Sequence, residues 1–458
     1  MKYIKKFILA LLFLINLTSC NKFLDVKPEG EIPAEEAIKT PADMQALLNG
    51  AYDVLRDGGF IGGMSRVIVD IIADDCDGSL LTTDYAEYYL LNTTIFNGTT
   101  RTLLQKAYMS INRTNSTLKN INQIALSDDE RNRIKGEALF IRAICHFELV
   151  RLFAQPYGYT PDNSHLGIPL RTELSDKPIS RSTVKEVYDQ VIADLKDAAT
   201  LIPATNGSYA TSWSAKGYLA KVYFQMNDFA NAYTYANDVI ANGGFAFDPN
   251  IMGRFSTNGT TEAVFQLVST GTQNNSGAKL ADIFGTTNDR TPIVPISENL
   301  YTASTANTDD ERGKQWYIKK SNQVFWSTRY NGLAYFQVPL VHLTELMLIR
   351  AESAAQLGNT TTAISDLNKI RNRAYGAGKN TIPNPTTAAQ LIQIARTERR
   401  LELATEGNRL HELKRIGVLE GNILIRGKAW NCNDMILQFT DSEISSNPLI
   451  IQNPKGGC

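Results

Sequence analysis

The residues of this sequence that most resemble catalytic groups are glutamates near the C-terminal end of the chain. Four of them lie in or close to the stretch ERRLELATEGNRLHELKR: Glu398, Glu402, Glu406 and Glu412. Pairs of carboxyl groups cleave glycosidic bonds in many hydrolases. Basic residues lie among these acids at spacings suited to ion pairs along and between helices: Arg396, Arg399, Arg400, Arg409, Lys414 and Arg415. Such a mixed set is more often structural, so we interpret the glutamates as partners in ion pairs.

Other familiar catalytic and ligand-binding patterns are incomplete. The sequence has no His-Glu-x-x-His pair, because its four histidines are scattered: His146, His165, His342 and His411. GAGKN at 376–380 lacks the first glycine of a phosphate-binding loop, and DDCDG at 74–78 lacks the spacing of a calcium loop. The chain also has no Gly-x-Ser-x-Gly elbow. We therefore predict a protein that is not an enzyme and has no cofactor or metal site.

A different chemistry is indicated by aromatic residues on irregular segments that are rich in amides. A sugar ring has apolar C–H faces and polar edges, so binding proteins stack it on aromatic rings and hydrogen-bond its hydroxyls. The predicted ligand site, chosen on this ground, consists of Trp316, Trp326, Tyr330, Tyr89, Asn92 and Arg329. The alternative for each aromatic residue alone is that it is a buried anchor for its loop.

These residues must be positioned by a largely helical chain. The stretch 343–374 reads as two helices, with apolar residues at three- and four-residue spacing on either side of Gly358-Asn359. Ala220–Ala232 can be laid over Ala351–Ala363 without a gap, and both end alanines, a glutamine and the turn pair coincide. One helical pair cannot bury its apolar face alone, so we expect several to stack. The sequence therefore predicts a mainly α, tetratricopeptide-like scaffold of helical hairpins.

The helical pattern has one long interruption. Residues 41–242 form an N-terminal helical part, and residues 339–458 form a C-terminal helical part. Between them, residues 243–338 are rich in Gly, Asn, Thr and Ser and contain strand-like pieces such as EAVFQLV at 262–268. This segment is predicted to be a loop-rich, partly β insertion.

The first 20 residues have the features of an export signal. Lys2, Lys5 and Lys6 precede an apolar run over 7–17 that is too short to span a bilayer, which needs about 20 residues. The run ends in LTSC, which resembles the lipobox of bacterial lipoproteins. Residues 1–19 are then a signal peptide, Cys20 is the lipidated first residue of the mature protein, and residues 20–40 are the lipid anchor and an extended tether. Two or more acyl chains anchor a protein stably.

Composition excludes some partners and leaves one question open. The formal net charge is −1, from 46 basic and 47 acidic residues, which gives no reason to expect nucleic acid. Four cysteines follow Cys20, too few for a disulfide scaffold in a chain of this length. Cys145 lies on the apolar side of a helix and is predicted to be a core residue. Pairing among Cys76, Cys432 and Cys458 stays open.

Five stretches, in this order along the chain, resemble the SusD/RagB family of surface lipoproteins. They are CNKFLDVKPEG, KGEALFIRAICHFELVRLFAQPYG, SAKGYLAKVYFQMNDFANAYTYANDVIANGG, LVHLTELMLIRAESAAQLGNTTTAISDLNKIRNRA and IARTERRLELATEGNRLHELKRIG. The closing SEISSNPLIIQNPKG is similar as well. The segment MILQFTD departs from the family, which usually has a Pro-containing apolar stretch there. The insertion is similar only in general character, so the ligand is not identified.

The resemblance implies a function and a location. Proteins of this family capture nutrients at the cell surface for a SusC-like, TonB-dependent transporter of the outer membrane. We therefore expect an outer-membrane lipoprotein, held by its lipid anchor, that binds an oligosaccharide. Two alternatives remain: the same architecture could bind peptides or another nutrient, or the chain could be an exported helical scaffold that binds only proteins.

Overall fold

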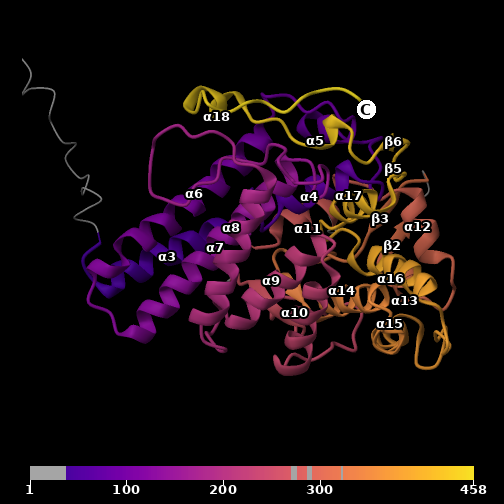
Figure 1. The fold of residues 1–458 in the computed structure, drawn as a ribbon. Coiled ribbons are helices and arrows are strands. Elements are labelled where there is room, and N and C mark those ends of the chain that lie inside the picture. The colour runs from indigo at the N-terminus through magenta and orange to yellow at the C-terminus, as the bar shows by residue number, and fades with distance from the viewer. Residues whose placement is uncertain (1–37, 270–275, 286–290, 321–322) are drawn as a thin grey trace, which may run out of the picture.

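Helices make up most of the chain, which confirms the predicted mainly α fold (Figure 1). The structure is a computed structural model that describes residues 38–269, 276–285, 291–320 and 323–458. The signal peptide, Cys20 and most of the predicted tether lie outside these residues. Within the described ranges, no helix is both long enough and apolar enough to cross a membrane.

Six helices of the N-terminal part stack on one another in chain order, each against the next. They are α3 (Pro41–Arg56), α6 (Gly98–Asn120), α7 (Asp128–Phe153), α8 (Val184–Leu201), α9 (Ser212–Gln225) and α10 (Phe229–Asn242). Capping boxes begin four of them, at Thr40, Ser127, Thr183 and Thr211. In each box the hydroxyl and the residue three positions on satisfy amide groups that the first turn leaves unpaired. The long helix α7 is buried along most of its length in the middle of this stack.

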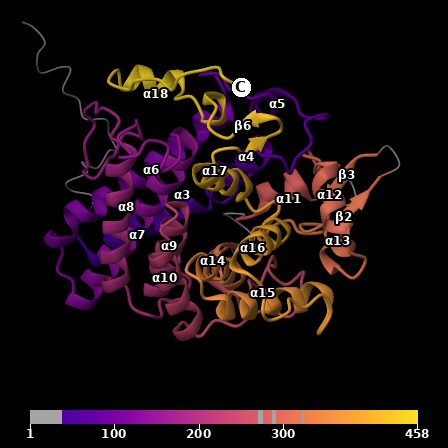
Figure 2. The same cartoon turned by 45° about the vertical axis from the view of Figure 1, so that its right-hand side comes forward.

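The stack continues into the C-terminal part without a break. Helix α10 packs on α14 (Leu343–Gln356), and α14 packs on both α15 (Thr360–Tyr375) and α16 (Ala388–Leu403). Figure 2 shows this arrangement, with the magenta helices α9 and α10 beside the orange helices α14 to α16. The core is therefore continuous between the two helical parts.

The two hairpins that align in sequence also have matching turns. Asn227 and Gly358 occupy equivalent positions, and both have positive φ, at 61° and 80°. The next residues, Asp228 and Asn359, cap α10 and α15 with φ/ψ of −82°/80° and −83°/76°. Asn and Gly are the residues that adopt this left-handed conformation at least cost. The structure thus confirms the hairpin repeat that the ungapped alignment predicts.

The insertion contains short elements on the edge of the stack. They are β1 (Ala263–Leu267), α11 (Ala278–Phe284), α12 (Glu298–Thr305), α13 (Glu311–Gln315), β2 (Tyr317–Lys319), β3 (Phe325–Ser327) and β4 (Val338–His342). Strand β1 pairs with β4 in antiparallel register, from Ala263 opposite His342 to Leu267 opposite Val338. Strands β2 and β3 form a separate antiparallel pair. The β1–β4 pair brings residues 263–267 next to the C-terminal end of the insertion, immediately before α14 begins.

The remaining elements lie together at one end of the molecule, at the top of Figure 1. They are α4 (Met64–Ile72), α5 (Thr83–Tyr89), α17 (Arg409–Glu420), β5 (Leu424–Ile425), β6 (Lys428–Ala429) and α18 (Asp441–Ser446), with a short 3₁₀ turn at Asn433–Met435. The other 3₁₀ turn, Ile121–Gln123, follows α6 and lies beside the start of α7. Cys432 and Cys458 form a disulfide there, with 5.4 Å between the Cα atoms. Cys76 and Cys145 are buried free thiols, as expected for Cys145.

Two elements of this end differ from the sequence prediction. Residues 74–98, DDCDGSLLTTDYAEYYLLNTTIFNG, have the composition of a loop within the predicted N-terminal helical part, yet they contain α5. Helix α4 was not predicted, because five of its nine residues MSRVIVDII are Val or Ile, which favour a strand, although Arg66 and Asp70 lie at helical spacing. Eight of the nine are buried, so tertiary packing overrides the strand preference of its Val and Ile residues.

Candidate functional site

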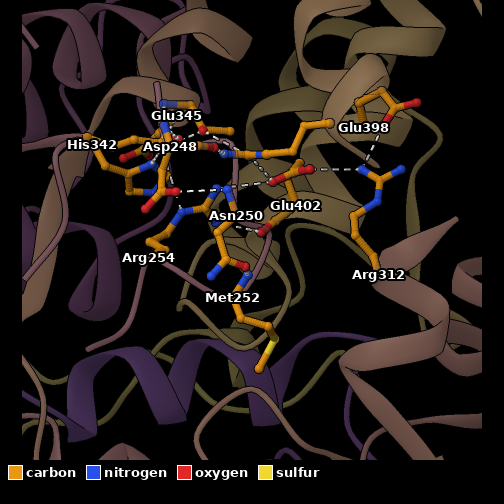
Figure 3. A network of polar contacts seen from close by, with 12 residues as sticks. Asp248, Asn250, Met252, Arg254, Arg312, His342, Glu345, Glu398 and Glu402 are labelled. Carbon is orange, nitrogen blue, oxygen red and sulfur yellow. Dashed lines mark hydrogen bonds and ion pairs between the residues drawn. The ribbon is translucent and has the colours of Figure 1, made fainter. Parts of the chain in front are cut away.

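The glutamates that resemble catalytic acids lie in a buried network of ion pairs (Figure 3). At its centre is Arg312 of α13, which is fully buried. Its guanidinium lies 2.8 Å from Asp310, 2.7 Å from Glu398 and 3.2 Å from Glu402. The network therefore ties the insertion to helix α16.

Further arginines extend the network across the same interface. Arg254 of the insertion lies 3.1 Å from Glu402 and 2.6 Å from Glu406. Arg373 of α15 lies 2.9 Å from Glu402 and 2.6 Å from Glu262. A buried charge is tolerated when partners surround it in this way.

The lowered pKa values of these glutamates suit a role in ion pairs better than a role in catalysis. Burial by itself would raise the pKa of Glu406, but Arg254, Arg329 and His342 together lower this pKa well below its ordinary value. The pKa of Glu402 is lowered in the same way by Arg373, Arg312 and Arg254 against the effect of burial. A general acid for glycoside cleavage needs the opposite, a raised pKa that keeps the proton at neutral pH. The prediction that these glutamates form ion pairs is therefore confirmed.

Two aspartates of the acidic DDCDG segment also form ion pairs within the protein. Asp75 lies 2.7 Å from Arg400 of α16, and Asp74 lies 2.7 Å from Arg409 at the start of α17. Among the described residues, no group of three or more His, Cys, Asp or Glu could hold a metal ion. The segment connects the end of α4 to the two C-terminal helices.

Four of the six residues predicted to bind ligand are buried. The exposed fractions are 1% for Trp316, 3% for Trp326, 4% for Arg329 and 1% for Tyr330. The Arg329 guanidinium lies 4.0 Å from the centre of the Trp316 ring and 2.7 Å from Glu406. The Tyr330 hydroxyl donates to the carbonyl of Thr405 at 2.9 Å. The expectation that these side chains present open faces is therefore wrong, since they anchor the insertion to the charged network.

The other two predicted residues lie on a different surface, at the end formed by α5. Tyr89 is half-buried and Asn92 is exposed. The guanidinium of Arg426, in the β5–β6 turn, lies 4.1 Å from the centre of the Tyr89 ring. Gly78 packs so close that a Cβ atom there would lie 2.0 Å from Tyr89. Together with the exposed Leu80, these residues form what we call the α5 face: Leu80, Tyr89, Asn92 and Arg426.

The insertion reaches this face through its backbone. The amide of Asp77 donates to the carbonyl of Pro295 at 2.9 Å, and Cys76 forms a β-bridge with Ile296. The α5 face is thus where the α4–α5 loop, the insertion and the β5–β6 turn meet. Sequence reasoning did not find Arg426, although Arg426-Gly427 lies between two strand-like pieces. Both residues have positive φ, as a two-residue hairpin turn requires.

Comparison with known proteins decides the family. Residues 22–224 match a SusD-like family described as "Starch-binding associating with outer membrane", and residues 247–455 match the SusD family. The first match covers most of the N-terminal helical part, and the second covers most of the insertion and of the C-terminal helical part, while α10 lies between them. The chain belongs to the SusD/RagB family.

Curated relatives and solved SusD structures resemble this chain over most of its length. SusD-like protein P2 of Formosa agariphila is 26% identical over 89% of both chains. A SusD superfamily protein from Bacteroides thetaiotaomicron matches with 25% identity and a TM-score of 0.78, covering 91% of this chain and all of the other. A proposed sugar binding protein from Bacteroides vulgatus matches with 26% identity and a TM-score of 0.79, over 92% of this chain and all of the other.

Proposed function

We propose that this SusD/RagB protein is a surface lipoprotein that binds glycans and delivers them to a SusC-like, TonB-dependent transporter in the outer membrane. The observation that carries the proposal is the pair of family matches over residues 22–224 and 247–455, one of which is described as starch-binding. The similar Bacteroides vulgatus protein is named as a sugar binding protein, which agrees with this proposal. The use of the candidate catalytic acids in buried ion pairs supports binding rather than hydrolysis.

The proposed anchor is the lipid on Cys20. It is supported by the LTSC motif after a short apolar run, and by the absence of a membrane-spanning helix from the described part of the chain. Replacement of Cys20 by Ser should leave the protein unlipidated and release it from the membrane fraction. A Cys20→Ser protein that still sediments with membranes would show that another element holds it.

The proposed ligand contacts are on the α5 face. Tyr89 offers an aromatic ring, Asn92 an amide and Arg426 a cation, the groups that stack on a sugar ring and hydrogen-bond its hydroxyls. A shallow site with few such groups should bind in the millimolar to micromolar range, about −4 to −8 kcal/mol. Weak binding suits a protein that must pass its ligand to a transporter.

Isothermal calorimetry with neutral oligosaccharides and with peptides of similar size would test this proposal. We expect the protein to bind one or more of the oligosaccharides, and Tyr89→Ala to weaken that binding at least fivefold. Tyr235→Ala is the matched control, because Tyr235 is also half-buried and stacked, but it lies on α10 at the other end of the molecule. Binding of peptides alone would favour a peptide-capturing protein of the same architecture.

A further inference from the structure

A groove on the side of the helical stack combines aromatic rings with uncharged polar groups. It has a volume of about 350 Å³ and lies between the α8–α9 loop, the start of α9, the segment after α10 and strand β1. Four aromatic residues line it: Tyr209, Trp213 and Phe245 are half-buried, and Phe265 is buried. The volume falls in the range of about 300–1,000 Å³ that is usual for small-molecule sites.

Polar groups in the groove have unused hydrogen-bonding capacity. The amide nitrogen of Asn206 donates to Glu137 at 2.9 Å and to the Ala210 carbonyl at 2.8 Å, which leaves the amide oxygen of Asn206 available as an acceptor. The side-chain oxygen of Gln266 is buried and accepts no hydrogen bond from the described residues. A buried polar atom without a partner costs stability, so such atoms often mark a site that a ligand or water completes.

The α8–α9 loop at the edge of the groove is held in place by hydrogen bonds to the buried side chains of Tyr52 and Glu137. Glu137 accepts a hydrogen bond from the Tyr52 hydroxyl at 2.7 Å as well as the one from Asn206. The same hydroxyl accepts from the Ala210 amide at 3.1 Å, and the Tyr52 and Tyr209 rings lie 5.1 Å apart. A preformed site loses less conformational entropy when a ligand binds.

Charge indicates the class of ligand. No Asp, Glu, Lys or Arg side chain is among the described residues that line the groove. Two cations lie beside the groove, and each is paired with an acid. Lys216 lies 4.4 Å from the centre of the Trp213 ring and 2.7 Å from Asp238, and Arg56 donates to the carbonyl of Val268 at 3.2 Å and pairs with Asp53. A charged ligand would find no partner there, whereas a neutral polyol would find aromatic faces and amides.

An extended peptide fits the groove less well. It would have to pair with the edge of β1 that faces away from β4, in the manner of an added strand. On that side the Val264 carbonyl already accepts from the Ser214 hydroxyl at 3.0 Å, and the Thr261 carbonyl accepts from the Ala246 amide at 3.2 Å. These bonds reduce the backbone groups that a peptide could use.

We infer that this groove is a second binding site, for one or more rings of a neutral oligosaccharide. The inference rests on the proposed function, and it adds a site that is remote from the α5 face. Helix α5 lies at the top of the molecule in both views, whereas α9 and α10 lie in its lower half (Figures 1 and 2). Two separate sites would let the protein hold a long glycan chain at two points and gain affinity through multivalency.

The sequence carries a signal for this site that reasoning from the sequence missed. The stretch TNGSYATSW at 205–213 has the same mixture of aromatic and amide-rich loop residues as the insertion. Trp213 lies within the predicted N-terminal helical part, 41–242, and helical periodicity alone does not distinguish it from a core residue. Its half-exposed position follows from the capping box at Thr211, which starts α9 and leaves Trp213 in the first turn beside the groove.

Tryptophan fluorescence tests the inference directly, because Trp213 is the one tryptophan of the four that is not buried. The others, Trp316, Trp326 and Trp430, are exposed by 1%, 3% and 8%. The mature protein would be titrated with maltoheptaose, cellohexaose, laminarihexaose and xylohexaose. We expect at least one of these to change the fluorescence of wild type and of Tyr89→Ala, but not that of Trp213→Phe.

Calorimetry with the same oligosaccharide provides the second readout. Trp213→Ala and Phe245→Ala should each weaken binding in the groove at least fivefold. Phe247→Ala is the matched control, since Phe247 is half-buried two residues away, packs under Lys369 and Arg373, and does not line the groove. Circular dichroism of each variant would verify that it is folded.

Two outcomes would overturn the inference, and they can be distinguished. If Tyr89→Ala abolishes oligosaccharide binding while Trp213→Ala and Phe245→Ala bind as wild type does, the groove is not a site but the proposed function stands. If wild type binds none of the oligosaccharides, both the groove assignment and the proposed glycan-binding function are wrong.

Discussion

Two aromatic regions of this protein look alike in sequence and differ completely in structure. Trp316 lies under the Arg329 guanidinium, which is paired with Glu406, and the whole group is buried among charged residues. Trp213 also lies under a cation, Lys216, but it is half-exposed beside a groove that no charged side chain lines in the described chain. The comparison teaches that similar aromatic, amide-rich sequences can form either a buried anchor among paired charges or a half-exposed groove lined by neutral side chains.

The buried ion pairs stabilise the fold only when each buried charge has its partner. They join Arg254, Arg312 and Arg329 of the insertion to glutamates 77 to 152 residues away in the chain. Removing one partner of a buried pair leaves an uncompensated charge, which costs far more than losing an exposed pair. The groove has no such requirement, so changes there should affect binding and leave the fold intact.

The largest expected effect comes from breaking the network at its centre. Arg312→Met removes a fully buried cation and leaves Asp310, Glu398 and Glu402 without it. We expect a loss of about 3–5 kcal/mol in the free energy of unfolding, measured by urea denaturation. Lys314→Met, on the same helix but in an exposed pair with Glu311, should change the free energy of unfolding far less. Equal stabilities of the two variants would show that the network contributes nothing.

A second prediction concerns pH. Burial would raise the pKa of Glu345, but Lys221 and Arg399 lower it to about 2. Because this pKa lies below the ordinary value of 4.5, the ionised carboxylate stabilises the fold above pH 4.5, and that stabilisation is lost as the pH falls towards 2. Glu345→Gln should therefore be less stable than wild type at pH 7 by roughly 3.5 kcal/mol, since lowering the pKa from 4.5 to about 2 corresponds to about 1.4 kcal/mol per pKa unit.

Thermal unfolding between pH 2.5 and pH 7 would measure this difference. The gap between Glu345→Gln and wild type should shrink steadily below pH 4.5. Glu311→Gln, at an exposed position, serves as the control and should follow wild type at each pH. A gap that stays constant down to pH 2.5 would contradict the assigned role of the carboxylate.

A third, smaller effect is expected in the apolar part of the stack. Ala351 is fully buried on α14, on the hairpin that aligns with α9–α10. Ala351→Leu overpacks the contact and should cost about 1–3 kcal/mol, with a clearly lower thermal midpoint. Ala230→Leu, at an exposed position of α10, is the matched control and should change the midpoint little. A midpoint of Ala351→Leu within error of wild type would mean that this face tolerates bulk and is not tightly packed.

The smallest expected effect is on the salt dependence of ligand binding. If the ligand is neutral and the groove has no charges, the dissociation constant should be the same in 50 mM and 500 mM sodium chloride. Calorimetry of the preferred oligosaccharide at both concentrations would test this. A tenfold weakening in high salt would indicate a charged ligand, and it would remove the contrast between the charged interior and the neutral surface.

The parts of this structure that could be predicted from sequence are those that local rules determine. Helical periodicity and the Asn227 and Gly358 turns were sufficient to predict the hairpins, because one residue type at one position decides the turn. The spacing of Glu398 and Glu402 among arginines likewise indicated ion pairs, since residues four apart lie on the same helix face.

The candidate site could not be predicted in the same way. Whether Trp316 is buried depends on Arg329 and on Glu406, which is 77 residues beyond Arg329 in the chain. No local pattern distinguishes this tryptophan from Trp213, because exposure is decided by which distant side chains cover the ring. For the same reason Arg426 became visible as a neighbour of Tyr89 only in the folded structure.

The most direct test of the account is a crystal structure of the mature protein with the oligosaccharide that binds most tightly in solution. The account predicts sugar rings at the α5 face, beside Tyr89 and Asn92, and in the groove, beside Trp213 and Phe245, with the buried ion pairs unchanged. Sugar bound among Arg312, Glu398 and Glu402, or on a surface that includes neither site, would contradict it.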